Sequence, residues 1–190
     1  MNKFHQLAAL SAAAVAATVI AAPAAHAAER PSCPTASKAE TKRSDDSKTD
    51  KPPRGATAIK GVRVNRIPKG FTYGVVNVNK HDGITEYGYR WSDNRDDVDR
   101  KHKSLWVRVV CWPKARTLAH LRKAPLVEGT FATAVTAKIG GRKVLTKVGD
   151  GALGHGRYAG WVERDGVIVT VMASEPLVSQ LGEIIKGIRL

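Results

Sequence analysis

Short alternating segments, joined in pairs by tight turns, constrain the fold of this chain most strongly. The turn sequences Asp82-Gly83, Gly140-Gly141 and Asp165-Gly166 each separate two such segments. Asp-Gly and Gly-Gly readily adopt the positive φ angles that two-residue hairpin turns require. Apolar and polar residues alternate on both sides of the turns, which is typical of β-strands. The clearest strand pattern lies between Leu105 and Trp112, and Pro113 ends it. Longer expected strands cover 71–79, 84–91, 105–112, 131–139, 142–148, 157–164 and 167–172, and a shorter alternating segment covers 62–66.

Two segments have helical spacing instead. Thr117 is a suitable N-cap for a short helix that ends at Lys123. A longer helix is expected after Ser174, with Pro176 in its first turn. Its apolar residues recur at helical spacing: Leu177, Leu181, Ile184, Ile185 and Ile188. The fold class is therefore expected to be α+β. We expect a curved antiparallel sheet of about seven strands in two meanders, packed on the C-terminal amphipathic helix, with the short helix between the meanders.

The first residues have the organisation of a secretory signal peptide. Lys3 provides a positive charge, and residues 7–20 form an uncharged apolar and small-residue run that Pro23 ends. An Ala-x-Ala site at Ala25–Ala27 predicts cleavage after Ala27. An uncleaved membrane anchor is the alternative, although the apolar run barely reaches the length that spans a bilayer. The pattern predicts a secreted, extracellular protein that is not an integral membrane protein once processed, and its Ala-rich composition is typical of bacteria.

The composition changes again near residue 57. Residues 38–54 contain no large apolar side chain, so they cannot bury enough surface to offset the entropy lost on ordering. The expected organisation is therefore a signal peptide at 1–27, a disordered polar tail at 28–56 and one globular domain at 57–190. Residues 57–190 carry 23 Lys and Arg against 12 Asp and Glu, so the basic excess lies in the folded part.

The net charge of +14 favours an anionic partner. Because the chain is expected outside the cytoplasm, a cell-surface or extracellular polymer is a better candidate than chromosomal nucleic acid. A generally basic surface without a dedicated ligand remains an alternative.

The two cysteines, Cys33 and Cys111, are expected to form a disulfide, since an even pair in an exported protein usually does. An intermolecular bond through Cys33 and a reactive thiol at Cys111 are the alternatives. The apolar neighbours of Cys111 indicate burial, and a reactive thiol needs exposure.

The C-terminal hairpin and helix carry a resemblance. The segment from Gly160 to Val171, which includes Trp161 and Glu163, and the apolar helix that follows resemble the ending of exported bacterial lipoprotein-carrier-like half-barrel domains. Related extracytoplasmic domains of unassigned function end in the same way. The resemblance covers residues 157–190 and implies an open sheet wrapped on a helix, with a cleft for an apolar or peptide ligand.

The glycine-rich segment 149–157 is the first candidate site. It places Asp150, His155 and Arg157 in one loop, where glycines allow close approach of the backbone and Arg157 could bind an anion. It lacks the Lys-Ser/Thr of a phosphate-binding P-loop. A tightly turned connector between hairpins is the alternative interpretation.

Basic residues on the strands form the second candidate. Arg90, Arg108 and Lys143 lie on segments that also carry Tyr and Trp, and a basic sheet with aromatic residues can hold single-stranded nucleic acid or a sugar polymer. Alternatively, the aromatic residues form the core and the basic residues face solvent.

No metal or cofactor is expected. The histidines of the expected mature chain, His81, His102, His120 and His155, have none of the spacings of metal sites. The leading hypothesis is a non-catalytic binding or interaction domain for an anionic partner. A hydrolase that acts on phosphodiesters through the 149–157 loop, assisted by His81 or His120, is the second hypothesis. A carrier with an apolar cleft is the third.

Overall fold

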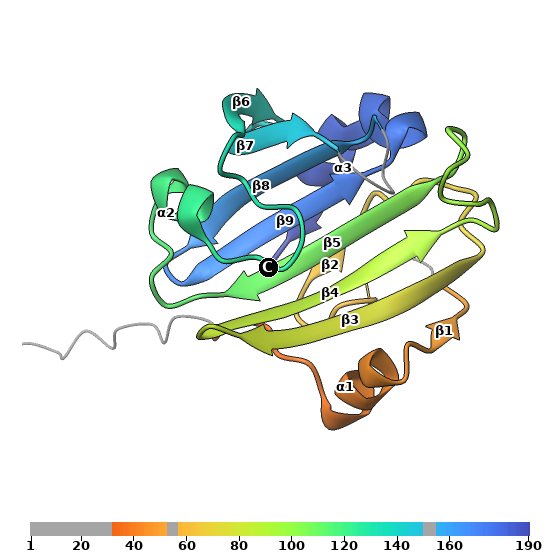
Figure 1. Cartoon of the computed structure of the whole chain (residues 1–190), viewed down its shortest axis with the longest axis horizontal. Coiled ribbons are helices and arrows are strands. Elements are labelled where there is room, and N and C mark those ends of the chain that lie inside the picture. Colours follow the sequence, from red (N-terminus) through yellow and green to blue (C-terminus); the bar gives the residue numbers. More distant parts are fainter. Residues whose placement is uncertain (1–31, 53–56, 150–154) are drawn as a thin grey trace, which may run out of the picture. The chain divides into compact units, whose positions relative to one another are not determined.

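The computed structural model describes residues 32–52, 57–149 and 155–190. The expected signal peptide lies outside these residues. The described residues belong to one compact unit, Ser32–Leu190. They form an open antiparallel sheet with short helices around it (Figure 1).

The main sheet has eight strands in the order β1-β3-β4-β5-β9-β8-β7-β6. All neighbouring strands are antiparallel. The strands are β1 (Thr49–Asp50), β3 (Tyr73–His81), β4 (Ile84–Ser92), β5 (Ser104–Cys111), β6 (Val135–Ile139), β7 (Arg142–Val148), β8 (Arg157–Arg164) and β9 (Val167–Ala173). Strands β3 to β5 form one meander and β6 to β9 form the other. The two meanders join where β5 pairs with β9, so the expected α+β class is confirmed.

Both faces of this sheet are covered, each by a different layer. We call them the α3 face, which includes Val107 and Val169, and the α2 face, which includes Arg108 and Thr170. Figure 1 is viewed from the α2 side, with α2 in front of the sheet and α3 behind it.

The α3 face carries the larger hydrophobic core. A 3₁₀ helix, η2 (Glu175–Gln180), leads into α3 (Leu181–Lys186). Leu177, Leu181, Ile184 and Ile185 are each at most 3% exposed, which confirms these four residues of the expected stripe. The fifth, Ile188, is also buried but lies beyond the end of the helix. A two-stranded ribbon, β2 (Arg63–Val64) with β10 (Ile188–Arg189), completes this layer.

The α2 face is covered mainly over β7 and β8. Helix α2 (Leu118–Lys123) begins at the expected cap, Thr117, whose side chain accepts a hydrogen bond from the His120 backbone N–H. Leu121 and Phe131 pack under it against Gly160. A Cβ at Gly160 would lie 2.8 Å from the Phe131 ring, so the absence of a side chain there lets the layer approach the sheet.

The expected disordered tail is wrong for residues 32–52. Residues Lys38–Asp45 form helix α1, and β1 pairs with β3 at the edge of the sheet. No residue of α1 is buried, so apolar burial does not order it. Instead Ser37 and Glu40 form a capping box. Glu40 also accepts a hydrogen bond of 2.6 Å from the buried Tyr87 hydroxyl.

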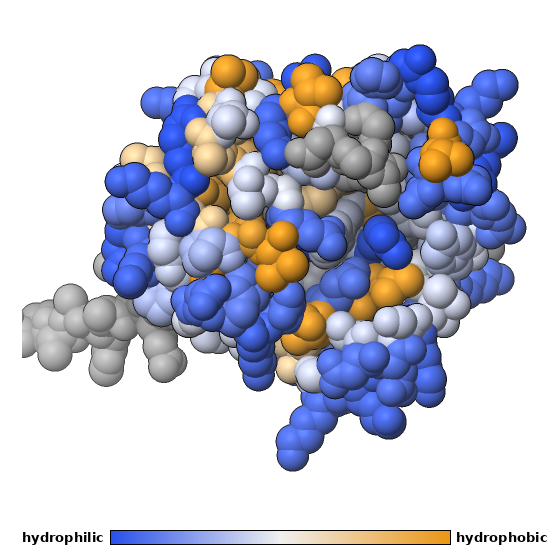
Figure 2. All heavy atoms as spheres, in the orientation of Figure 1, coloured by the Kyte–Doolittle hydropathy of each residue, from blue (hydrophilic) through white to orange (hydrophobic). Residues whose placement is uncertain are grey.

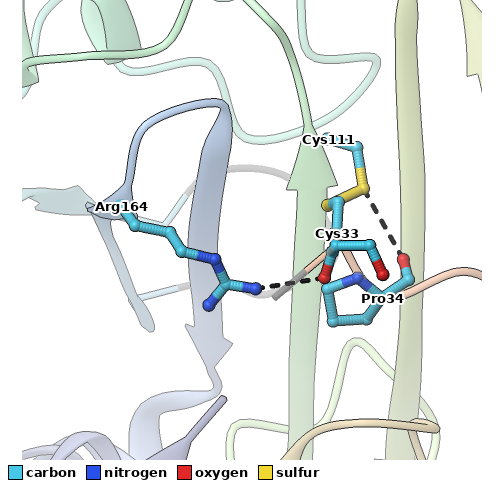
Figure 3. Close-up of a disulfide and its surroundings, with 5 residues drawn as sticks. Cys33, Pro34, Cys111 and Arg164 are labelled. Carbon is cyan, nitrogen blue, oxygen red and sulfur yellow. Dashed lines mark hydrogen bonds between the residues drawn. A yellow bond between two sulfur atoms is a disulfide. The ribbon is translucent and has the colours of Figure 1, made fainter. Parts of the chain in front are cut away.

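The expected disulfide is present, and it anchors the same segment. Cys33 and Cys111 are bonded, with Cα atoms 5.9 Å apart and a sequence separation of 78. Figure 3 shows the bond at the end of β5, beside Pro34. Arg164 on β8 donates a hydrogen bond of 3.2 Å to the Ser32 carbonyl. This covalent tie to the central strand replaces the apolar burial that the segment lacks.

Three of the differences from expectation concern how an element packs, pairs or is capped. The strand expected from Phe131 begins at Val135, because Phe131 turns into the core under α2. Only Arg63–Val64 of the expected 62–66 strand is extended, and it pairs outside the main sheet. Ser174 precedes the final helix, but its hydroxyl accepts from the Ser104 backbone N–H rather than from that helix.

Among the helices of the described ranges, none has the length and apolar character to cross a membrane.

Candidate functional site

Basic residues concentrate in one stretch of the chain. Residues 114–149 contain eight Lys and Arg but only one acidic residue, Glu128. These residues form α2, the following loop, β6 and β7. Two of the eight pair with acidic residues of other segments: Arg116 lies 3.5 Å from Asp165, and Arg142 lies 2.7 Å from Glu163.

Strands β6 and β7 place two of these charges side by side. Lys138 and Lys143 are direct cross-strand partners, and both are exposed. Lys143 points to the α2 face, because Leu145, two residues further along β7, belongs to the core of that face. Lys123 at the end of α2 is exposed on the same side, and Arg122 bonds the carbonyl of Ala134, next to the start of β6. We call Arg122, Lys123, Lys138 and Lys143 the basic surface. Figure 2 shows hydrophilic residues around the rim of this face.

The sequence-predicted site residues do not gather in one place. Arg90 on β4 is exposed and lies opposite Trp106 on the α2 face. Arg157 begins β8 opposite Ala173 and belongs to the α3 face. His155 is exposed in the turn before β8, and Asp150 lies outside the described residues. Lys143 contributes to the basic surface, four strands away from Arg90 in the sheet order.

Arg108 is a component of the core rather than a solvent-facing residue. Its side chain is 2% exposed and forms an ion pair of 2.5 Å with Glu86, which is 5% exposed. The expectation that it could share an exposed basic face is therefore not met. A buried guanidinium needs partners for its donors, and Arg108 has them on three neighbouring elements.

A dense polar network surrounds this pair. Arg108 Nε donates to Thr170 Oγ1 at 3.1 Å, and Nη2 donates to the Glu128 carbonyl at 2.8 Å. Glu86 Oε1 accepts from the Val127 backbone N–H at 3.2 Å. The guanidinium carbon lies 4.5 Å from the centre of the Trp106 ring. Burial lowers the pKa of Arg108, while the Glu86 carboxylate acts in the opposite direction and favours the charged form.

His81 extends the network at the end of β3. Its Nε2 lies 3.1 Å from Glu86 Oε1, and its Nδ1 lies 3.4 Å from Asp82. Burial of the ring opposes its charging, but the hydrogen bonds to Glu86 and Asp82 outweigh burial and raise the pKa of His81. His81 thus connects the Glu86–Arg108 ion pair to the end of the β3–β4 hairpin.

Gly88 makes room for the buried arginine. It lies directly opposite Arg108 in the β4–β5 register. A Cβ at Gly88 would lie 2.6 Å from Arg108 Cγ and 2.5 Å from the Val107 carbonyl oxygen. The sequence-based candidates did not include Glu86 and Gly88, although a glutamate and a glycine in an otherwise aromatic strand are visible in the sequence.

The other histidines have separate surroundings. His102 is buried, with Nδ1 3.1 Å from Asp93 Oδ1 and Nε2 3.3 Å from Ser92 Oγ. His120 accepts a hydrogen bond from the Arg116 backbone N–H. Within the described part of the chain, no group of three or more His, Cys, Asp or Glu residues is arranged to hold a metal ion.

Comparisons with protein-family models, with curated proteins and with solved structures find no match to this chain.

Proposed function

We propose that this protein is a non-catalytic binding domain that holds an anionic cell-surface polymer on its basic surface. The observation that carries the proposal is the charge asymmetry of residues 114–149, with eight basic residues and one acidic residue. A surface with an excess of positive charge attracts polyanions and raises their rate of encounter.

The cross-strand pair of Lys138 and Lys143 supports this proposal. Like charges directly opposite each other destabilise a sheet in the absence of a partner. A bound polyanion would neutralise both ammonium groups at once and release the counterions that accompany the polymer. Since both residues stand on strands, their spacing is held by the backbone ladder rather than by a loop.

The expected export of the chain suggests the identity of the polymer. Outside a bacterial cell, phosphodiester-linked wall polymers present a regular row of negative charges. We therefore propose a polymer of this class as the partner.

The test is binding to purified poly(glycerol phosphate), with neutral dextran as the polymer control. We expect retention at low salt that is lost at high salt, because exposed charge pairs are screened. The K138E/K143E variant should bind at least about tenfold more weakly. A matched variant, K80E/K101E, makes the same change in net charge at exposed lysines outside the basic surface and should bind nearly as well as the wild type.

Retention that does not depend on salt would overturn the proposal. Equal loss of binding in both double variants would also overturn the assigned surface, because it would indicate a response to net charge alone. Stronger binding to single-stranded DNA than to the wall polymer would identify a different class of partner.

A further inference from the structure

Helix α1 and strand β1 cover the outer edge of β3, the edge that faces away from β4 (Figure 1). Strand β1 pairs with Gly74 and Val75 at one end of this edge. Further along, the Ser44 hydroxyl of α1 accepts a hydrogen bond of 2.8 Å from the Val78 backbone N–H and donates one of 3.4 Å to the Val78 carbonyl. Both outward backbone groups of Val78 therefore have a partner in α1. We call residues 33–50 the edge cap.

The edge cap is held mainly by polar contacts and by one covalent bond. No residue of α1 is buried. Its Glu40 accepts a hydrogen bond from the Tyr87 hydroxyl, and Cys33 and Ala36 are the apolar residues of the cap that pack against the core of the α3 face. The bond from Cys33 to Cys111 is the strongest attachment, and both cysteines are only partly buried. Cleavage of this bond leaves a segment with little apolar burial to hold it on β3.

The covered edge of β3 has the properties of a strand that pairs readily with another strand. It is nine residues long, it contains Val75, Val76 and Val78, and Lys80 is its only Lys, Arg, Asp or Glu. β-branched residues and low charge favour strand pairing. Alternate residues of β3 bond β4, so the backbone groups of Gly74, Val76 and Val78 point to the outer edge. Without the edge cap, these groups form an open edge that another strand can join.

A second copy of β3 fits this edge in an antiparallel register centred on Asn77. In this register Val76 of each copy lies opposite Val78 of the other copy, and Asn77 lies opposite Asn77. Lys80 lies opposite Gly74, so the lysines do not oppose each other as like charges. The strand at the other end of the sheet, β6, has only five residues and therefore offers a shorter ladder.

From these observations we infer that the edge cap is a redox-controlled cover that prevents self-association through β3. A dithiol reductant attacks the Cys33–Cys111 bond, forms a mixed disulfide and then closes its own disulfide, which leaves two cysteine thiols. The edge cap then leaves β3, and β3 pairs with β3 of a second copy to form one continuous sheet. The basic surface includes β6 and β7, at the opposite end of the sheet, so this interface goes beyond the proposed function.

The first experiment is sedimentation velocity of the chain from Ala28 onward, which contains the whole compact unit, with and without dithiothreitol. We expect the oxidised protein to be a monomer. The reduced protein should form a dimer whose fraction rises with protein concentration. The C33S/C111S variant should form the same dimer without reductant. A monomer in both redox states, or an equal dimer fraction in both, would overturn the inference.

Two proline variants in the C33S/C111S background identify the edge that pairs. V78P removes an outward N–H of β3 and keeps the β3–β4 hydrogen bonds, because the Val78 N–H bonds Ser44 instead of β4. It should weaken dimerisation at least about tenfold, since each copy loses one hydrogen bond. T136P makes the same change on β6, where Thr136 also faces outward, and should leave the dimer affinity unchanged. The reverse result would place the interface at β6 and overturn the inference.

A cysteine placed at the centre of the expected pair tests the register. In the C33S/C111S background, N77C brings two thiols opposite each other, at a Cα separation of about 4.5 Å that a disulfide can bridge. N79C is the matched control on the same face of β3, because its thiols would be offset by four residues, about 13 Å along the strand. Oxidation should link N77C into a covalent dimer at least about tenfold faster than N79C. Equal rates would overturn the β3–β3 register.

Hydrogen exchange of the dimer distinguishes β3 pairing from an exchange of edge caps between copies. In a β3–β3 dimer the amides of α1 lose protection, whereas protected α1 amides in the dimer would show exchanged caps and overturn the inference. Thermal unfolding shows whether each variant is folded, and if V78P is not, the comparison of N77C with N79C decides. Polymer binding is measured separately on the oxidised chain and on K138E/K143E, so failure of the β3 interface and failure of the basic surface are distinguished.

Discussion

Arg108 on β5 and Glu86 on β4 form an ion pair of 2.5 Å inside the α2 face, and neither side chain is more than 5% exposed. The pair connects the first meander to Thr170 on β9 and to the loop after α2.

Removal of one partner of the Glu86–Arg108 pair should lower the unfolding free energy. R108M leaves the Glu86 carboxylate buried without its counter-charge, and breaking such a pair costs about 3–5 kcal/mol of unfolding free energy. The double variant E86M/R108M removes both charges and should recover much of the loss. Urea denaturation of the two variants and of K80M, an exposed control, measures these values. A cost for R108M no larger than that of K80M would show that the pair does not contribute to stability.

His81 should make stability depend on pH near neutrality. Burial of the ring lowers the pKa of His81, but its hydrogen bonds to Glu86 and Asp82 outweigh this effect and raise the folded pKa above the ordinary value of 6.5. The charged ring therefore stabilises the fold fully below pH 6.5, and the contribution declines as pH rises through the folded pKa. The difference in unfolding free energy between wild type and H81Q should thus shrink from pH 6 to pH 8. Parallel stability curves for the two proteins over this range would contradict the assignment.

Loss of the disulfide should release the N-terminal segment. The bond closes a loop with a sequence separation of 78, for which chain entropy predicts at most about 4.5 kcal/mol of stabilisation. In the C33S/C111S variant, amides of α1 should exchange with solvent much faster than amides of β5, because no residue of α1 is buried. Hydrogen exchange measures this in the variant and in the wild type with and without reductant. Unchanged protection of α1 in the variant would mean that its caps and polar contacts suffice.

Gly88 should not tolerate a side chain. G88A places a Cβ 2.5 Å from a backbone oxygen, and overpacking of this kind typically costs about 1–3 kcal/mol. G182A in α3 is the matched control. The nearest atom to its Cβ would lie 3.9 Å away, and alanine favours the helix by about 1 kcal/mol. Thermal unfolding should therefore shift down for G88A and up slightly for G182A. The same direction of shift in both would contradict the steric argument.

The strands and turns could be predicted because their signals are local. The Asp82-Gly83, Gly140-Gly141 and Asp165-Gly166 turns all connect neighbouring antiparallel strands in the structure. The C-terminal apolar stripe and the Thr117 cap are local patterns as well, and both are present. The helix at 38–45 was not expected, because the composition of the segment indicates only how little apolar surface it can bury. Its order depends on a disulfide and on hydrogen bonds to Tyr87, which is 47 residues from Glu40.

The environment of Arg108 could not be predicted from its own segment. Alternation in β5 separates the two faces of the sheet correctly but does not reveal that both faces are covered. Burial of Arg108 depends on Glu86, 22 residues earlier, and on Thr170, 62 residues later. Likewise, the charges of residues 114–149 are visible in the sequence, but only the β6–β7 register places Lys138 opposite Lys143.

The sequence by itself determined the strand periods, the hairpin turns, the final amphipathic helix and the α+β class. Each of these depends on residues that are close together in the sequence. The tertiary structure decided which face each strand presents, what covers it and which charges are buried. Those outcomes depend on contacts between segments far apart in the chain. The edge cap on β3 is a result of this kind, since Ser44 lies 34 residues before Val78, whose backbone it bonds.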